Sequence, residues 1–155
     1  MRKKNSVSGT SILLSAIAMA AVFFITREVY KPEPILEDYF HSYSLENKLD
    51  MRIDEAEAIK LFKEGKAVLV DVRFPKEQAE MNAGFGYMIP LNELPDRIDE
   101  LPKDKLIVTG CFMNERGNMA RLYLMTKGYK AKHLFSGIPG LTEKLTDEDR
   151  AILVE

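Results

Sequence analysis

The sequence from residue 66 to residue 73 is KAVLVDVR, and this stretch decides the fold class. Residues 67–72 form a nearly unbroken apolar run rich in β-branched side chains, which is typical of a strand buried on both faces. A second such run, LIVT, follows at 106–109. Strands buried on both faces belong to parallel sheets, in which helices connect one strand to the next. The two runs therefore predict an α/β domain.

Helical patterns alternate with the strand candidates. The segment 55–63 is predicted to be a helix, because Asp54 and Glu57 have the spacing of a capping box and Gly65 follows its end. Further helices are expected at 91–101, where Pro95 interrupts the stretch, at 116–127, where Gly128 ends the helix, and after Pro139. Three short strands are expected at 49–53, 87–89 and 131–135. Five strands interleaved with helices predict a mostly parallel five-stranded sheet with helices on both faces.

The N-terminal segment is predicted to be a single transmembrane helix. Residues 5–26 carry no charged side chain. As a helix they would span about 33 Å at ~1.5 Å per residue, which is enough for the lipid bilayer's hydrocarbon core of about 30 Å. Because Arg2, Lys3 and Lys4 precede the segment, the N-terminus is expected in the cytoplasm and the rest of the chain outside the inner membrane. A signal peptide cut near Ala18-Met19-Ala20 is the alternative, and it would release the domain into the periplasm.

Length and composition limit the number of domains and the kinds of partner and site that the chain can have. The 155 residues accommodate one ordinary domain plus an extension, so residues 1–34 are expected to be anchor and linker and residues 35–155 the α/β domain. The net charge is −2 and no long basic stripe is present, which argues against nucleic acid as a partner. The single cysteine excludes an internal disulfide, and His41 and His133 fit no metal-ligand pattern. No metal and no cofactor are expected.

The one cysteine, Cys111, follows the strand expected at 106–109, and open parallel sheets place their active sites at such strand ends. A loop, Cys111-Phe112-Met113-Asn114-Glu115-Arg116, leads from it into the next helix. The loop's backbone N–H groups and the positive end of that helix would favour a thiolate, which is the reactive form of cysteine. Arg116 would add positive charge and could hold an anionic substrate. A small core residue at a strand end is the alternative role for Cys111.

Over residues 53–145 the sequence resembles the rhodanese family of sulfurtransferases. The resemblance is carried by Asp71-Val72-Arg73 at a strand end, by Ile89-Pro90-Leu91, by LFSGIPGL at 134–141, and by a Cys and an Arg separated by four residues. It implies a rhodanese-like domain in which Cys111 attacks a sulfane sulfur and becomes a persulfide. A thiol or cyanide would then accept the outer sulfur.

The resemblance also implies roles for the site residues. Cys111 would be the nucleophile, Arg116 and Arg73 would bind an anionic substrate, and Asp71 would support the loop by hydrogen bonds. The other residues expected to contact the substrate are Phe112, Met113, Asn114, Glu115 and Gly117. For Arg73, a salt bridge at the strand end is an equally good role. Because Phe112 and Met113 make the rim of the loop apolar, a persulfide, a polysulfide or a protein thiol fits it better than thiosulfate.

Two other functions fit the same loop. The cell-cycle dual-specificity phosphatases share the rhodanese fold, but five residues separate their Cys and Arg, so the four found here favour sulfur over phosphate. Glu115, directly before Arg116, is a feature shared with those phosphatases. The other alternative is a non-catalytic module that binds a partner or senses redox state through Cys111. A persulfide on Cys111 would distinguish the sulfurtransferase from both.

Overall fold

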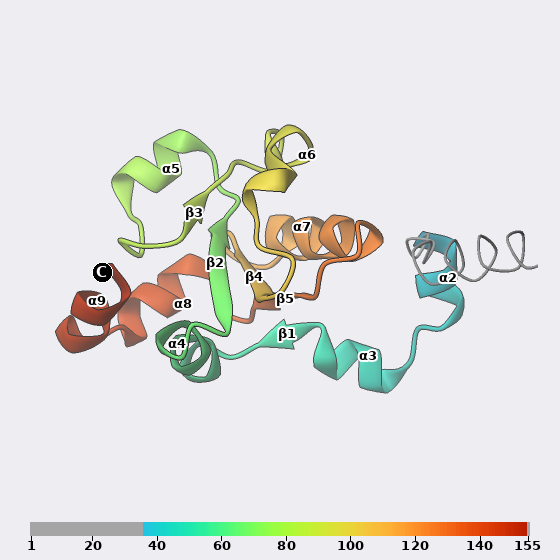
Figure 1. Ribbon diagram of the computed structural model, residues 1–155, viewed down its shortest axis with the longest axis horizontal. Coiled ribbons are helices and arrows are strands. Elements are labelled where there is room, and N and C mark those ends of the chain that lie inside the picture. The colour runs from blue at the N-terminus through green and yellow to red at the C-terminus, as the bar shows by residue number, and fades with distance from the viewer. Residues whose placement is uncertain (1–35, 155) are drawn as a thin grey trace, which may run out of the picture. The chain divides into compact units, whose positions relative to one another are not determined.

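Five parallel strands form the centre of the computed structural model, which describes residues 36–154 (Figure 1). In chain order they are β1 (Arg52–Ile53), β2 (Ala67–Asp71), β3 (Tyr87–Met88), β4 (Leu106–Gly110) and β5 (Ala131–Leu134). In space the order is β1-β5-β4-β2-β3, so β4 is the central strand and lies between β5 and β2. Every neighbouring pair is parallel, which confirms the predicted five-stranded sheet.

Helices cover both faces of this sheet, as predicted. The helices that pack on one face are α4 (Glu55–Lys63), α8 (Gly137–Lys144) and α9 (Asp147–Val154). The helices that pack on the other face are α6 (Leu94–Arg97), the 3₁₀ turn η1 (Ile98–Glu100) and α7 (Glu115–Thr126). The remaining helices are α2 (Leu36–His41) and α3 (Leu45–Asp50), which precede β1, and α5 (Pro75–Glu80), which follows β2.

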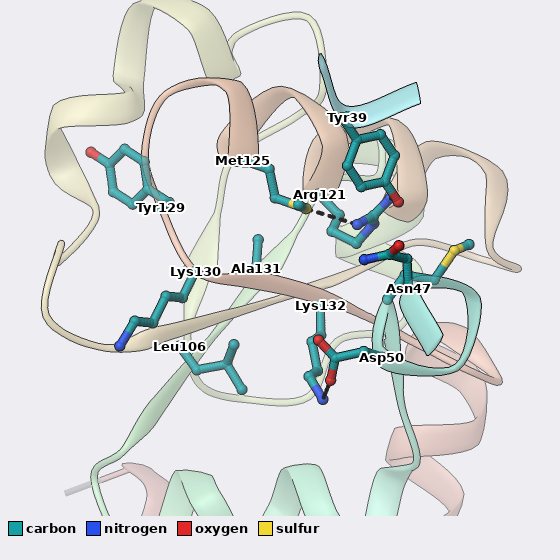
Figure 2. Close-up of a pocket in the computed structure, with 11 residues that line it drawn as sticks. Tyr39, Asn47, Asp50, Leu106, Arg121, Met125, Tyr129, Lys130, Ala131 and Lys132 are labelled. Atoms are coloured by element: carbon teal, nitrogen blue, oxygen red, sulfur yellow. Dashed lines mark hydrogen bonds and ion pairs between the residues drawn. The ribbon is translucent and has the colours of Figure 1, made fainter. Parts of the chain in front are cut away.

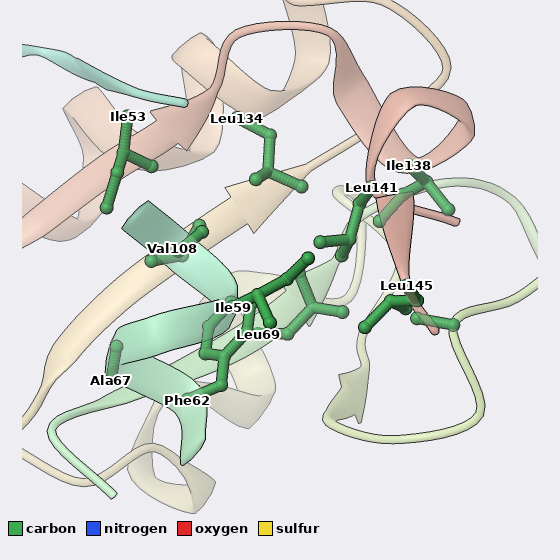
Figure 3. Close-up of a cluster of buried hydrophobic side chains, with 12 residues drawn as sticks. Ile53, Ile59, Phe62, Ala67, Leu69, Val108, Leu134, Ile138, Leu141 and Leu145 are labelled. Carbon is green, nitrogen blue, oxygen red and sulfur yellow. The ribbon is translucent and has the colours of Figure 1, made fainter. Parts of the chain in front are cut away.

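Alternating side chains of β2 enter two separate hydrophobic clusters. Leu69 packs on one face with Phe62 of α4 and with α8, in the cluster that Figure 3 shows. Val70 packs on the other face with Leu124 of α7. Both faces of the strand are therefore covered, which explains why the run is apolar at nearly every position.

The segment before β1 differs from the prediction. A strand was expected over 49–53, but only Arg52–Ile53 pairs with the sheet, and α3 occupies Leu45–Asp50. Ser44 supplies the physical reason. Its hydroxyl accepts a hydrogen bond from the backbone N–H of Asn47, whose side chain accepts one from the N–H of Ser44 in return. This reciprocal cap starts a helix, and the helix takes up the residues that were expected to begin the strand.

Helices α5 and α9 were also not foreseen. Helix α5 nevertheless carries a recognisable start signal, because Pro75 occupies its first turn. The Glu77 carboxylate accepts a hydrogen bond from the N–H of Phe74 at 3.0 Å, which caps the helix. Helix α8 begins at Gly137, ahead of Pro139, after which it was expected. Helix α4 has the predicted bounds, with the Asp54 carboxylate accepting from two N–H groups of its first turn.

Residues 1–35 lie outside the described part of the chain, and with them the transmembrane helix predicted at 5–26 and its signal-peptide alternative. Between residues 36 and 154, no helix is long and apolar enough to cross a bilayer. The membrane anchor therefore stays a prediction.

Gly137, in the turn between β5 and α8, packs against the loop that follows β4. Its φ is +66°, in the left-handed region that favours glycine. A Cβ at this position would lie 2.5, 2.8 and 2.7 Å from the backbone oxygens of Cys111, Phe112 and Met113. The next residue, Ile138, donates its N–H to the oxygen of Cys111 at 2.8 Å. The turn before α8 thus packs directly on the Cys111 loop.

Substituting this glycine tests that packing. Gly137→Ala should lower the free energy of unfolding by roughly 2–4 kcal/mol, because a left-handed alanine is strained and its methyl group overlaps three carbonyl oxygens. Gly65→Ala is the matched control, since Gly65 has a φ of +65° with nothing within 4 Å of its Cβ position. It should cost only about 1 kcal/mol. Urea denaturation of both variants measures the difference, and equal losses would contradict the packing described here.

Candidate active site

Cys111 directly follows the central strand β4, at the carboxyl edge of the sheet where the sequence places it. The side chain is 2% exposed and packs in the cluster on the α7 face. On one side the N–H of Val72 donates to the oxygen of Gly110 at 2.9 Å, and on the other side Ile138 donates to the oxygen of Cys111. The backbone on both sides of the cysteine is therefore held by neighbouring elements.

The loop after Cys111 presents backbone N–H groups that have no partner. The carbonyl oxygens of residues 111–113 converge on Gly137, and in a trans peptide the N–H points opposite to the C=O. The N–H groups of Phe112, Met113 and Asn114 therefore point away from Gly137. In the part of the chain that the structure covers, none of these three groups donates a hydrogen bond. A run of free N–H groups of this kind forms a concavity that binds anions.

Helix α7 begins immediately after this loop, at Glu115. Asn114 is its N-cap residue and makes no side-chain capping bond, so the first-turn N–H groups add to the positive potential. The hydroxyl of Thr109 in β4 donates to the oxygen of Gly117 at 2.7 Å, which holds the start of α7 against the sheet. A Cβ at Gly117 would lie 3.7 Å from the nitrogen of Cys111, an ordinary contact, so lack of space does not explain the glycine there.

Arg116 lies at the loop but is already paired. Its terminal nitrogens donate to the two carboxylate oxygens of Glu77 at 2.6 and 2.7 Å, and its guanidinium carbon lies 5.3 Å from the ring centroid of Phe74. The hydrogen bond to Glu77 is the main cause of a raised pKa for Arg116, and the negative charge of the same carboxylate adds to it. The bond to Arg116 in turn lowers the pKa of Glu77 to about 2. Glu77 is a residue of this site that the sequence did not reveal.

Arg73 forms a salt bridge at the strand end, which is one of its two expected roles. It is 1% exposed and forms a bidentate pair with the Asp71 carboxylate, with bonds of 2.7 to 3.2 Å, and it also donates to the oxygen of Met81. The Gln78 amide donates to the oxygens of Asp71 and Arg73 at 3.0 Å each. The buried guanidinium thus closes the turn after β2, and its role in binding an anion stays a prediction. Asp71 supports this turn, whereas the expectation was that it supports the Cys111 loop.

The remaining predicted residues divide between two surfaces. Phe112 and Met113 of the loop are 56% and 63% exposed, and Phe74, whose ring lies beside the Arg116 guanidinium, is also exposed. Asn114 and Glu115 instead line a separate cavity of about 410 Å³, together with residues of α3, β1 and β5. The structure therefore brings together the sulfur, the free N–H groups, the apolar rim and a neutralised arginine.

Comparison with known proteins gives the domain a family context. No protein-family model matches the chain. A sulfurtransferase of Allochromatium vinosum is 37% identical over 62 residues, which is 40% of this chain and 58% of that protein, so the match spans little more than half of the relative's length.

Two solved structures show the same fold. A rhodanese-related protein of Thermoplasma volcanium superposes with a TM-score of 0.54 at 24% identity, over 60% of this chain and 91% of that one. The reduced CoADR-RHD of Bacillus anthracis matches with a TM-score of 0.53 at 36% identity, over 62% of this chain and 17% of that one. The described residues thus share the α/β fold of these two structures.

Proposed function

We propose that this chain is a sulfurtransferase that carries sulfane sulfur as a persulfide on Cys111. The observation that carries this proposal is the run of free N–H groups at residues 112–114, beside a cysteine fixed at the end of the central strand. A thiolate and a terminal persulfide sulfur are both anions, and preorganised amides stabilise such charge in the manner of an oxyanion hole. The partial identity to a sulfurtransferase supports the same chemistry.

The two half-reactions balance without net oxidation or reduction. The Cys111 thiolate attacks the outer sulfur of a donor R–S–S⁻, a new S–S bond forms, and the donor leaves as R–S⁻ with the electron pair of the bond that breaks. The thiolate of an acceptor then attacks the outer sulfur of the Cys111 persulfide, and the cysteine leaves as the original thiolate. Cyanide can act as the acceptor in the same way. This is a ping-pong covalent sequence that needs no separate acid–base pair.

The surroundings of Cys111 favour a donor with an apolar part over thiosulfate. Both terminal nitrogens of Arg116 donate to Glu77, so a dianionic donor would meet a guanidinium whose charge is already balanced by a carboxylate. The exposed rings and thioether of Phe74, Phe112 and Met113 instead offer apolar contact area. We therefore propose organic persulfides or polysulfides as donors and a thiol as the acceptor.

The burial of Cys111 favours a second candidate, a rhodanese-fold binding module without catalysis. At 2% exposure within a hydrophobic cluster, the thiol is also well placed to serve only as a packing residue. A phosphatase is less well supported, because the arginine that would bind the phosphate dianion is neutralised by Glu77. The two candidates differ in whether the sulfur of Cys111 reacts.

Intact mass measures that difference. After incubation of the full-length chain with polysulfide, the wild type should gain one sulfur, about 32 Da, whereas Cys111→Ser should gain none. Subsequent addition of cyanide or a small thiol should return the wild type to its original mass. If the wild type gains no sulfur, or if Cys111→Ser gains as much, the sulfurtransferase proposal fails and the binding module takes its place.

Glu77→Gln tests the proposed donor preference. Removing the carboxylate charge should free Arg116 for an anion and lower the KM for thiosulfate by roughly three- to tenfold. The rate with an apolar organic persulfide should change less than about twofold. Glu93→Gln is the matched control, because it removes one of the two carboxylates that pair with Arg97 of α6. A similar change for both donors would mean that Glu77 acts by positioning the loop and not by occupying an anion site.

A further inference from the structure

A second cavity, of about 370 Å³, is lined by residues of two strands and three helices (Figure 2). It lies at the opposite end of the sheet from Cys111. Leu106 and Ala131, the first residues of β4 and β5, line it, whereas Cys111 follows the last residue of β4. The five residues of β4 extend over roughly 16 Å at ~3.3 Å each, so the two sites are separate. Helices α2, α3 and α7 supply the other walls through Tyr39, Asn47, Asp50, Arg121 and Met125.

Arg121 is the unusual residue of this cavity. It is 3% exposed, and its partners are the Asn118 amide oxygen at 2.9 Å, the Tyr39 hydroxyl at 3.1 Å and the sulfur of Met125 at 2.8 Å. The Tyr39 ring centroid lies 5.4 Å from the guanidinium carbon. All of these groups are neutral. Among residues 36–154, Arg121 forms no ion pair.

A guanidinium is always charged and carries five N–H donors, of which three have partners at Arg121. Burying such a charge costs free energy that neutral partners repay only in part. Between residues 36 and 154, the other arginine buried to this degree is Arg73, and it has the bidentate carboxylate of Asp71. Arg121 lines a cavity instead, and its two unused donors belong to its terminal nitrogens. An anion in the cavity would supply the missing counter-charge.

The other charged groups of the lining add to the positive potential. Lys130 and Lys132 line the same cavity, and Asp50, its one carboxylate among the described residues, forms an ion pair with Lys132 at 2.7 Å. The lining therefore has two positive charges in excess, although the whole chain has a net charge of −2. His133 of β5 adds no charge near neutral pH, because burial, assisted by the nearby Arg121, lowers its pKa.

We propose that this cavity binds a small organic phosphate monoester. Two excess positive charges match a phosphate dianion better than a single carboxylate, and a guanidinium fork fits the paired oxygens of phosphate. The apolar lining of Leu106, Met125 and Ala131, with the face of Tyr39, would contact the organic part of the ligand. The volume is in the lower range of small-molecule sites. This inference does not depend on the chemistry of Cys111.

Phenyl phosphate is a suitable probe, titrated into the full-length chain by calorimetry. We expect phenyl phosphate to bind saturably. Inorganic phosphate should bind at least about tenfold more weakly, because it lacks the apolar part, and benzyl alcohol should not bind. Benzoate should bind less tightly than phenyl phosphate. Lys130→Gln should weaken the affinity by roughly three- to tenfold, whereas Lys60→Gln, the same charge change on α4, should leave it within about twofold.

Arg121→Met should abolish binding of phenyl phosphate while the chain stays folded, because replacing an unpaired buried charge with an apolar side chain is tolerated or stabilising. If that variant does not fold, the surface variant Lys130→Gln decides. The proposal is overturned if the wild type shows no saturable binding, if Arg121→Met binds equally well, or if Lys130→Gln and Lys60→Gln behave alike. Sulfur loading of Cys111 should be the same in Lys130→Gln and wild type, which separates this site from the proposed active site.

Discussion

The contact between the turn at Gly137 and three successive carbonyl oxygens of the Cys111 loop is the constraint on which the site depends. Because those oxygens converge on a glycine without a Cβ, the intervening N–H groups must point to the other side of the loop. A chain segment that begins some twenty-five residues further along therefore sets the direction of the dipoles beside the cysteine. The packing of α8 on the sheet and the chemistry proposed for the sulfur are in this way consequences of the same turn.

Three arginines in this domain show how the partner of a guanidinium decides its role. Arg73 is buried with Asp71 and closes a turn, so its charge is fully used inside the protein. Arg116 lies at the reactive loop with Glu77, so its charge is present but neutralised. Arg121 is buried among neutral groups beside a cavity, which leaves its charge for a ligand. From the sequence, both Arg73 and Arg116 are candidates for binding an anion, and only Arg73 has a salt bridge as an equally good role. Their partners in the structure separate the two residues further.

The buried strands and the place of Cys111 were predictable because they depend on local patterns. A strand that is apolar on both faces must be covered on both faces, and Cys111 directly follows such a strand. The start of β1 was not predictable, because the Ser44–Asn47 cap starts a helix in residues whose apolar side chains suggested a strand. Glu77 was missed since it is 39 residues from Arg116 in sequence, and only the pairing of β2 with β4 brings them together. The burial of Arg121 depends on Tyr39 of α2, which no pattern within α7 indicates.

The central claim is that the loop amides hold the sulfur of a Cys111 persulfide, and amide proton shifts test it most directly. In ¹⁵N–¹H spectra of the chain loaded with sulfane sulfur, the amide protons of Phe112, Met113 and Asn114 should move downfield, as expected for N–H groups that donate to an anionic sulfur. Removing the sulfur with cyanide should return them to their starting positions. A persulfide that forms on Cys111 while these three resonances stay unchanged would contradict the account.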